Sequence, residues 1–108
     1  MGLFDWLGGK GGKAMALYKK GMAKAKNHDH AGAIQDYTAA IDQPHASTEV
    51  LAMTRYNRAL VYAAMGDNVR AEADLNQVLA APDSVSNFKA MAKQKLARMG
   101  TRTRLSGK

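Results

Sequence analysis

The chain of 108 residues contains no cysteine. Disulfide bonds and thiolate metal sites are therefore excluded, and cysteine usage does not reveal the redox compartment. No apolar run approaches the roughly 20 residues that a membrane-spanning helix needs. The opening residues 1–7 are too short for the apolar part of a signal peptide, and Trp6 stands where a myristoylation motif requires serine or threonine. We therefore expect a soluble cytoplasmic protein.

Acidic residues are missing from the last part of the chain, although the net charge of +7 hides this. Residues 1–30 carry +4, residues 31–84 carry −4, and residues 85–108 carry +7 with no acid at all. Such a basic end attracts nucleic acid, anionic lipid or an acidic protein surface without selecting among them. No aromatic residue follows Phe88, so stacking of nucleic-acid bases on this end is not expected.

Motifs of catalysis and of metal binding are absent as well. The chain has no nucleophile-elbow motif and no Walker-type loop, and its Gly-rich residues 8–13 have the composition of a flexible linker. His28 and His30 flank Asp29, but a tetrahedral metal site needs three or four convergent ligands, and we interpret this stretch as a turn. We predict a protein that is not an enzyme, with no metal and no cofactor.

An internal repeat is present instead, and its period of roughly 40 residues is typical of stacked supersecondary units. One shift carries Ala14-Met15 onto Ala52-Met53, and then onto Ala90-Met91. The same shift aligns the small residues Gly21, Ala59 and Ala97. It also pairs identical residues in the two units, namely Tyr18 with Tyr56, Ala25 with Ala63, Asp29 with Asp67, Ala33 with Ala71, Asp36 with Asp74, and Pro44 with Pro82.

Each unit has the pattern of two helices, and no alternation typical of strands occurs. Apolar residues recur at helical spacing in the second half of each unit: Ile34, Tyr37 and Ile41 in the first, and Val69, Leu75, Val78 and Leu79 in the second. Asp29, Ser47 or Thr48, and Asp67 are expected as N-caps, Gly66 as a left-handed helix end, and Pro82 as a stop. The predicted helices cover 13–26, 31–42, about 48–65, from 68 to before Pro82, and about 86–99.

These elements define three regions. Residues 1–12 form a flexible N-terminal segment with an apolar tip, residues 13–99 an all-α domain, and residues 100–108 a basic, disordered tail. Lys89, Lys93 and Lys95 are expected to give the last helix the soluble outer face that a terminal cap requires.

The second unit resembles the tetratricopeptide-repeat (TPR) family. The small residue Ala59, the aromatic Tyr62 three places on and the Gly66-Asp67 turn follow the order of that motif, although the family's repeat is a few residues shorter than the repeat of this chain. Ala71, Leu75, Val78 and Pro82 also match, as do Gly21, Ala33, Tyr37, Ala40 and Pro44 in the first unit. The resemblance implies two antiparallel helical hairpins and a fifth capping helix in a right-handed solenoid fragment.

The same resemblance implies a non-catalytic scaffold that binds a peptide or protein in a concave groove, lined by the first helix of each unit. Carried onto this chain, the groove residues are Met15, Tyr18, Met22, Met53, Tyr56, Asn57, Leu60, Met91, Gln94 and Arg98. An alternative remains that this stripe of Met and Tyr is core. The carboxylate-gripping set of some family members is not predicted, because Tyr18 and Met22 stand where lysine and asparagine are needed.

The apolar tip comprises Leu3, Phe4, Trp6 and Leu7. Because large apolar side chains are costly to leave in water, we expect them to dock in the domain's own groove, on a partner protein or on a membrane surface. The alternative function is therefore a peripheral membrane or nucleic-acid adaptor that acts through this tip and the basic ends. Two units are few for a stable stack, so self-association also stays open.

Overall fold

The computed structural model describes residues 12–106 of the chain, with side chains for residues 12–100. Five α-helices and one short 3₁₀ turn account for most of this part, and none of these residues lies in a strand. They are α2 (Gly12–Lys26), α3 (His30–Ile41), α4 (Thr48–Ala64), α5 (Asn68–Leu79), η1 (Asp83–Val85) and α6 (Ser86–Ser106). The predicted all-α class is confirmed, whereas the apolar tip Leu3–Leu7 lies outside the described residues.

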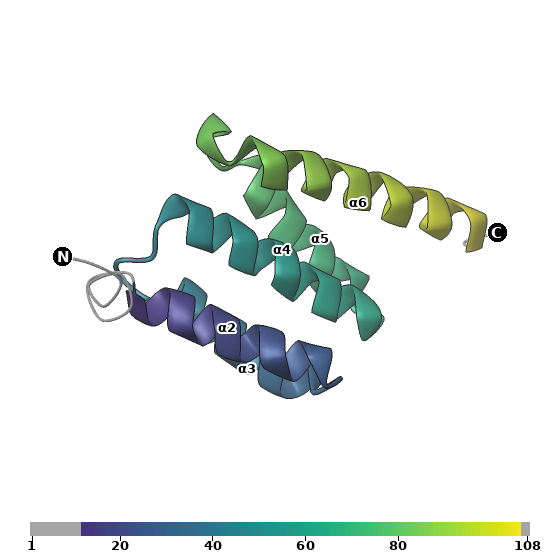
Figure 1. Cartoon of the computed structure of the whole chain (residues 1–108). Helices are drawn as coiled ribbons and strands as arrows, with labels where there is room; N and C mark the ends of the chain where they lie inside the picture. The colour runs from purple at the N-terminus through teal and green to yellow at the C-terminus, as the bar shows by residue number, and fades with distance from the viewer. Residues whose placement is uncertain (1–11, 107–108) are drawn as a thin grey trace.

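The helices form two hairpins and a fifth helix, packed side by side (Figure 1). α3 contacts both its own partner α2 and the next helix α4, and α5 in the same way contacts α4 and α6. The first helices also touch one another, α2 against α4 and α4 against α6. α2, α4 and α6 therefore form one row, with α3 and α5 behind it.

The two hairpin turns lie one repeat apart and have the same geometry. His28 and Gly66 both take the left-handed conformation, with φ of 62° and 84°. The next residue, Asp29 or Asp67, donates its backbone N–H to the carbonyl of Lys24 or Tyr62 at 2.8 and 2.9 Å. Each aspartate then caps the following helix through its side chain, as predicted. His28 therefore fills the role of the turn glycine, a conformation that histidine adopts more readily than most residues.

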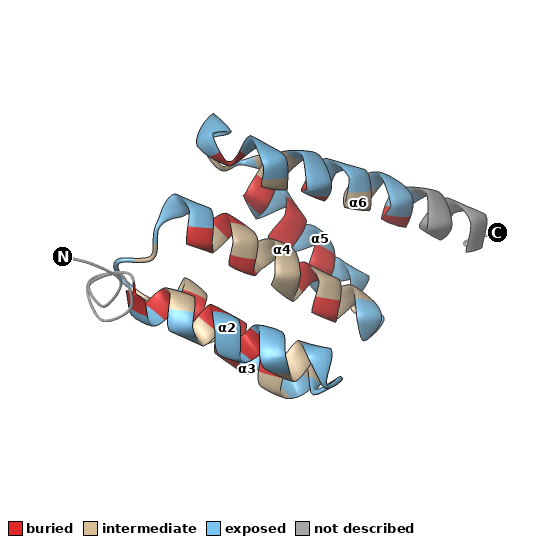
Figure 2. Ribbon diagram, in the orientation of Figure 1, coloured by how far each residue is buried: buried red, intermediate tan, exposed pale blue. Residues whose placement is uncertain are grey.

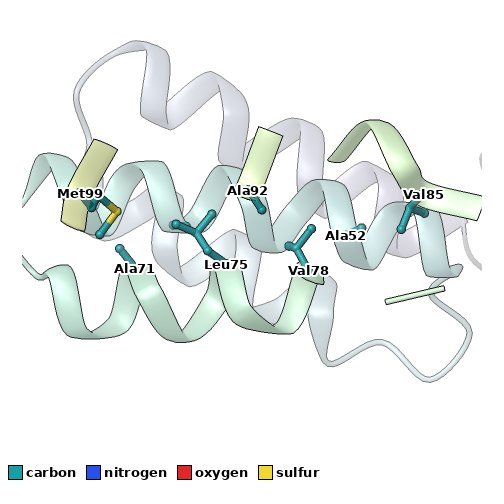
Figure 3. Packing of buried hydrophobic residues seen from close by; sticks show 8 residues of the cluster. Ala52, Ala71, Leu75, Val78, Val85, Ala92 and Met99 are labelled. Atoms are coloured by element: carbon teal, nitrogen blue, oxygen red, sulfur yellow. The ribbon is translucent and has the colours of Figure 1, made fainter. Parts of the chain in front are cut away.

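The buried positions also repeat, and each helix buries the side that faces its neighbours (Figure 2). Ala33 and Ala71 are fully buried, and the aligned pair Tyr37 and Leu75 are at most 1% exposed. In the second hairpin, Ala71, Leu75 and Val78 of α5 meet Ala92 and Met99 of α6 (Figure 3). The repeat seen in the sequence is therefore a repeat of the core.

Three sequence predictions differ from the structure. Val69 is 80% exposed and not part of the apolar stripe, because it lies roughly 200° around the helix from the buried Ala71. The last helix does not end near Gly100 but continues to Ser106, since Gly100 is not in the left-handed conformation that ends a helix. Lys89 is half-buried, and it donates to the Ala81 carbonyl at 2.8 Å and to Asp83 at 3.0 Å.

The close contact of the first hairpin depends on a glycine. A Cβ atom added to Gly21 would lie 2.5 Å from Cδ1 of Tyr37. In the second hairpin, alanine stands at the position of Gly21 and leucine at that of Tyr37, namely Ala59 and Leu75, both buried. The larger ring in the first hairpin is therefore matched by the smaller partner.

This match predicts a compensating pair of substitutions. We expect Gly21→Ala to lower the free energy of unfolding by about 2 kcal/mol, because the rigid ring of Tyr37 cannot yield to the added methyl group. In a Tyr37→Leu background, Gly21→Ala should cost much less, since the first hairpin then has the same alanine and leucine pair that Ala59 and Leu75 form in the second hairpin. Urea denaturation of the two single variants and the double variant measures the coupling. Additive effects would contradict this account of the contact.

Candidate functional site

Two clefts lie where the row of first helices meets the second helix behind it. The first cleft, of about 210 Å³, opens between the end of α2, the start of α3 and the second half of α4. Its lining residues are Ala25, His30, Tyr37, Asn57, Leu60, Val61 and Ala64. The second cleft, of about 130 Å³, lies at the corresponding place one hairpin further on, and it is lined by Ala63, Asn68, Lys95, Arg98 and Met99.

The two clefts are related by the sequence repeat. Every residue that lines the second cleft is a residue of the first cleft shifted by one repeat: Ala63 corresponds to Ala25, Asn68 to His30, Lys95 to Asn57, Arg98 to Leu60, and Met99 to Val61. The clefts are therefore produced by the repeating packing of the chain, and not by irregular packing at one point.

The first cleft is mainly apolar, and its polar side chains are those of His30, Tyr37 and Asn57. Asn57 donates its amide to the Tyr18 hydroxyl at 3.2 Å and to the Met53 carbonyl at 2.8 Å, which ties α4 to α2. Burial raises the pKa of Tyr37 to about 12, so its hydroxyl stays neutral over the physiological range. Leu60 is half-buried and forms part of the wall. This cleft can hold an apolar side chain, and its lining contains no lysine, arginine, aspartate or glutamate.

The second cleft has a different chemical character. Lys95 is half-buried and Arg98 is exposed, while Met99 closes the floor at 8% exposure. The prediction that Lys95 belongs to the outer face of a terminal cap is therefore wrong. Two cations three residues apart lie on the same side of α6, because residues at this spacing are neighbours on a helix.

Three of the predicted groove residues line the clefts: Asn57 and Leu60 the first, and Arg98 the second. Tyr18 is instead buried, at 7% exposure, and its ring lies 5.9 Å from that of Tyr37. Tyr56 is half-buried and packs against the core cluster of the second hairpin. Both tyrosines therefore serve the core, which was the alternative that the sequence left open.

The other predicted groove residues are divided between core and surface. Met15 and Met53 pack against the core cluster of the first hairpin. Met22 and Met91 are 45% and 41% exposed, and Gln94 is exposed, but none of the three lines either cleft.

Lys95 and His30 were not predicted from the sequence as cleft residues. The signal for Lys95 was present, because the shift that pairs Leu60 with Arg98 also pairs Asn57 with Lys95. His30 gave no such signal: it is the first residue of α3, and only the hairpin geometry brings it to the cleft.

Other kinds of site find no support in the described part of the chain. There, no group of three or more histidine, aspartate or glutamate side chains is placed to hold a metal ion. No helix of the described chain has the length and apolar character needed to cross a membrane. Comparison with protein-family models, with curated proteins and with solved structures gave no match. The clefts themselves therefore carry the functional argument.

Proposed function

We propose that this chain is a non-catalytic protein-interaction scaffold, related in design to tetratricopeptide repeats, that binds an extended segment of a partner protein along its row of first helices. The observation that supports this proposal is the pair of clefts related by the sequence repeat. A partner chain has a repeating backbone too, and side chains spaced a few residues apart along an extended segment can enter the two clefts.

The dimensions of the clefts favour a peptide over a small molecule. Pockets for drug-sized ligands typically hold about 300–1,000 Å³, and each of these clefts is smaller than that. Neighbouring packed helices lie about 8–10 Å apart, and an extended chain rises about 3.3 Å per residue. Side chains about three residues apart in a partner can therefore reach both clefts.

Selection of random peptides displayed on phage against the immobilised full-length protein tests this proposal. We expect a recurring motif among the selected peptides, and we expect Leu60→Asp to weaken binding of a selected peptide by roughly thirtyfold. The reason is that a charge in the wall of the first cleft removes its apolar contact, and loss of a central contact costs about 2 kcal/mol. Fluorescence anisotropy of the labelled peptide gives the affinity.

The matched control is Val69→Asp, which places the same charge on an exposed apolar residue that lines neither cleft. This variant should bind like the parent, and thermal melting of both variants separates lost binding from lost folding. If no peptide is enriched, or if both variants bind a selected peptide equally well, the scaffold proposal fails.

A further inference from the structure

The two clefts have the same architecture but different charge. At the two corresponding positions of the wall, α4 supplies Asn57 and Leu60 to the first cleft, and α6 supplies Lys95 and Arg98 to the second. Two neutral side chains in the first cleft therefore correspond to two cations in the second, and this makes the two ends of the surface chemically different. One end of it suits an apolar side chain and the other end suits negative charge.

These two cations are available to a ligand. Four other basic side chains of the described chain are each paired with an aspartate: Lys24 with Asp36, Arg58 with Asp74, Arg70 with Asp67, and Lys89 with Asp83. Within residues 12–100, no carboxylate lies at ion-pair distance from Lys95 or Arg98. Their charge is therefore not neutralised by an acidic side chain of the described structure.

We propose that the second cleft receives acidic side chains, so that the partner is a segment with an apolar residue and a run of aspartate or glutamate about three residues away from it. This inference rests on the proposed function and names its partner class. Charge complementarity of this kind raises the association rate and fixes the register of the bound segment.

A run of acidic residues fits better than a single terminal carboxylate. The positive charge is not confined to the cleft, because residues 85–108 carry seven basic residues and no acid. A partner with several acidic side chains meets this extended field, whereas one carboxylate meets only Lys95 and Arg98.

An acidic protein segment also fits better than a nucleic acid. The wall that α4 gives the first cleft holds no cation for a phosphate, and none of the tyrosine and phenylalanine side chains that the structure describes is exposed for base stacking. The apolar first cleft instead matches a large apolar side chain, which a protein segment supplies.

The test uses the peptides selected on the full-length protein. We expect acidic residues to be enriched about three positions from the apolar peptide residue whose contribution to binding is lost in the Leu60→Asp variant. The double variant Lys95→Glu/Arg98→Glu should bind such a peptide roughly tenfold more weakly at low salt, and the difference should shrink as salt is added. The matched control is Lys20→Glu/Lys26→Glu, which changes the net charge equally at exposed positions outside both clefts and outside the basic residues 85–108, and which should bind the peptide like the parent.

Each outcome decides between the two proposals. Peptides that depend on Leu60 but carry no acidic run, and that bind the Lys95→Glu/Arg98→Glu variant normally, would overturn this inference and leave the scaffold function intact. Absence of any selected peptide would overturn both. If a selected peptide loses its affinity when its terminal carboxylate is amidated, the second cleft recognises a chain end and not an acidic run. If a single-stranded oligonucleotide competes with the peptide for the parent protein and fails to bind the double variant, the ligand of the second cleft is a nucleic acid and not an acidic protein segment.

Discussion

Replacing Ala71 by glutamate should leave the domain largely unfolded at room temperature. Ala71 is fully buried in α5, where the hairpin helices and α6 meet (Figure 3). A longer side chain has no room there, and its carboxylate would be buried without a partner, at a cost on the order of 5 kcal/mol. A domain of this size has a total stability of about that amount, so the folded population should collapse. Circular dichroism at about 222 nm and urea denaturation measure the loss.

The matched control is Ala73→Glu, two residues further along the same helix. Ala73 is exposed, so the added carboxylate remains in water and stability should change by no more than about 0.5 kcal/mol. Ala33→Glu, at the corresponding buried position of the first hairpin, should repeat the damage. An Ala71→Glu variant with the stability of the Ala73→Glu variant would show that the packing of α5 is not as described.

Removal of Arg58 should have the second largest effect, a loss of about 3 kcal/mol in Arg58→Ala. Its guanidinium donates two hydrogen bonds to the carboxylate of Asp74, at 2.8 and 2.7 Å, and a third to the Thr38 hydroxyl at 3.0 Å. These bonds join α4 both to its own hairpin partner α5 and to α3 of the preceding hairpin. Hydrogen bonding to Asp74 raises the pKa of Arg58, and the truncation would leave a buried aspartate without its cation.

The corresponding pair in the first hairpin provides the comparison. Asp36 occupies the position of Asp74, but the side chain of its partner Lys24 is 39% exposed, against 17% for Arg58, and makes no bond to a neighbouring hairpin among the described residues. Lys24→Ala should therefore cost much less than Arg58→Ala. Arg58→Lys should fall between them, because an ammonium group keeps the charge but cannot make the paired bonds of the guanidinium. Equal losses in Arg58→Ala and Lys24→Ala, measured by urea denaturation, would refute the role of Arg58 as a tie between hairpins.

The helices and turns could be predicted from the sequence because their signals are local. Asp29, Ser47 and Asp67 accept a hydrogen bond from a backbone N–H three residues further on, which requires nothing from the rest of the chain. The left-handed conformation at Gly66 is likewise favoured locally, because glycine adopts it without a steric cost. The internal repeat extended this local information, since a second unit with the same signals has the same hairpin.

Tertiary structure alone decided which side chains form the core and which form the site. Tyr18 and Leu60 are both large residues on first helices, yet the first is buried against Tyr37 and the second lines a cleft. Periodicity places a residue on a side of its helix, but whether that side is covered depends on helices that are distant in the sequence. The same reason explains Lys95: α6 repeats the position of α4, so a lysine expected on an outer face becomes the wall of a second cleft.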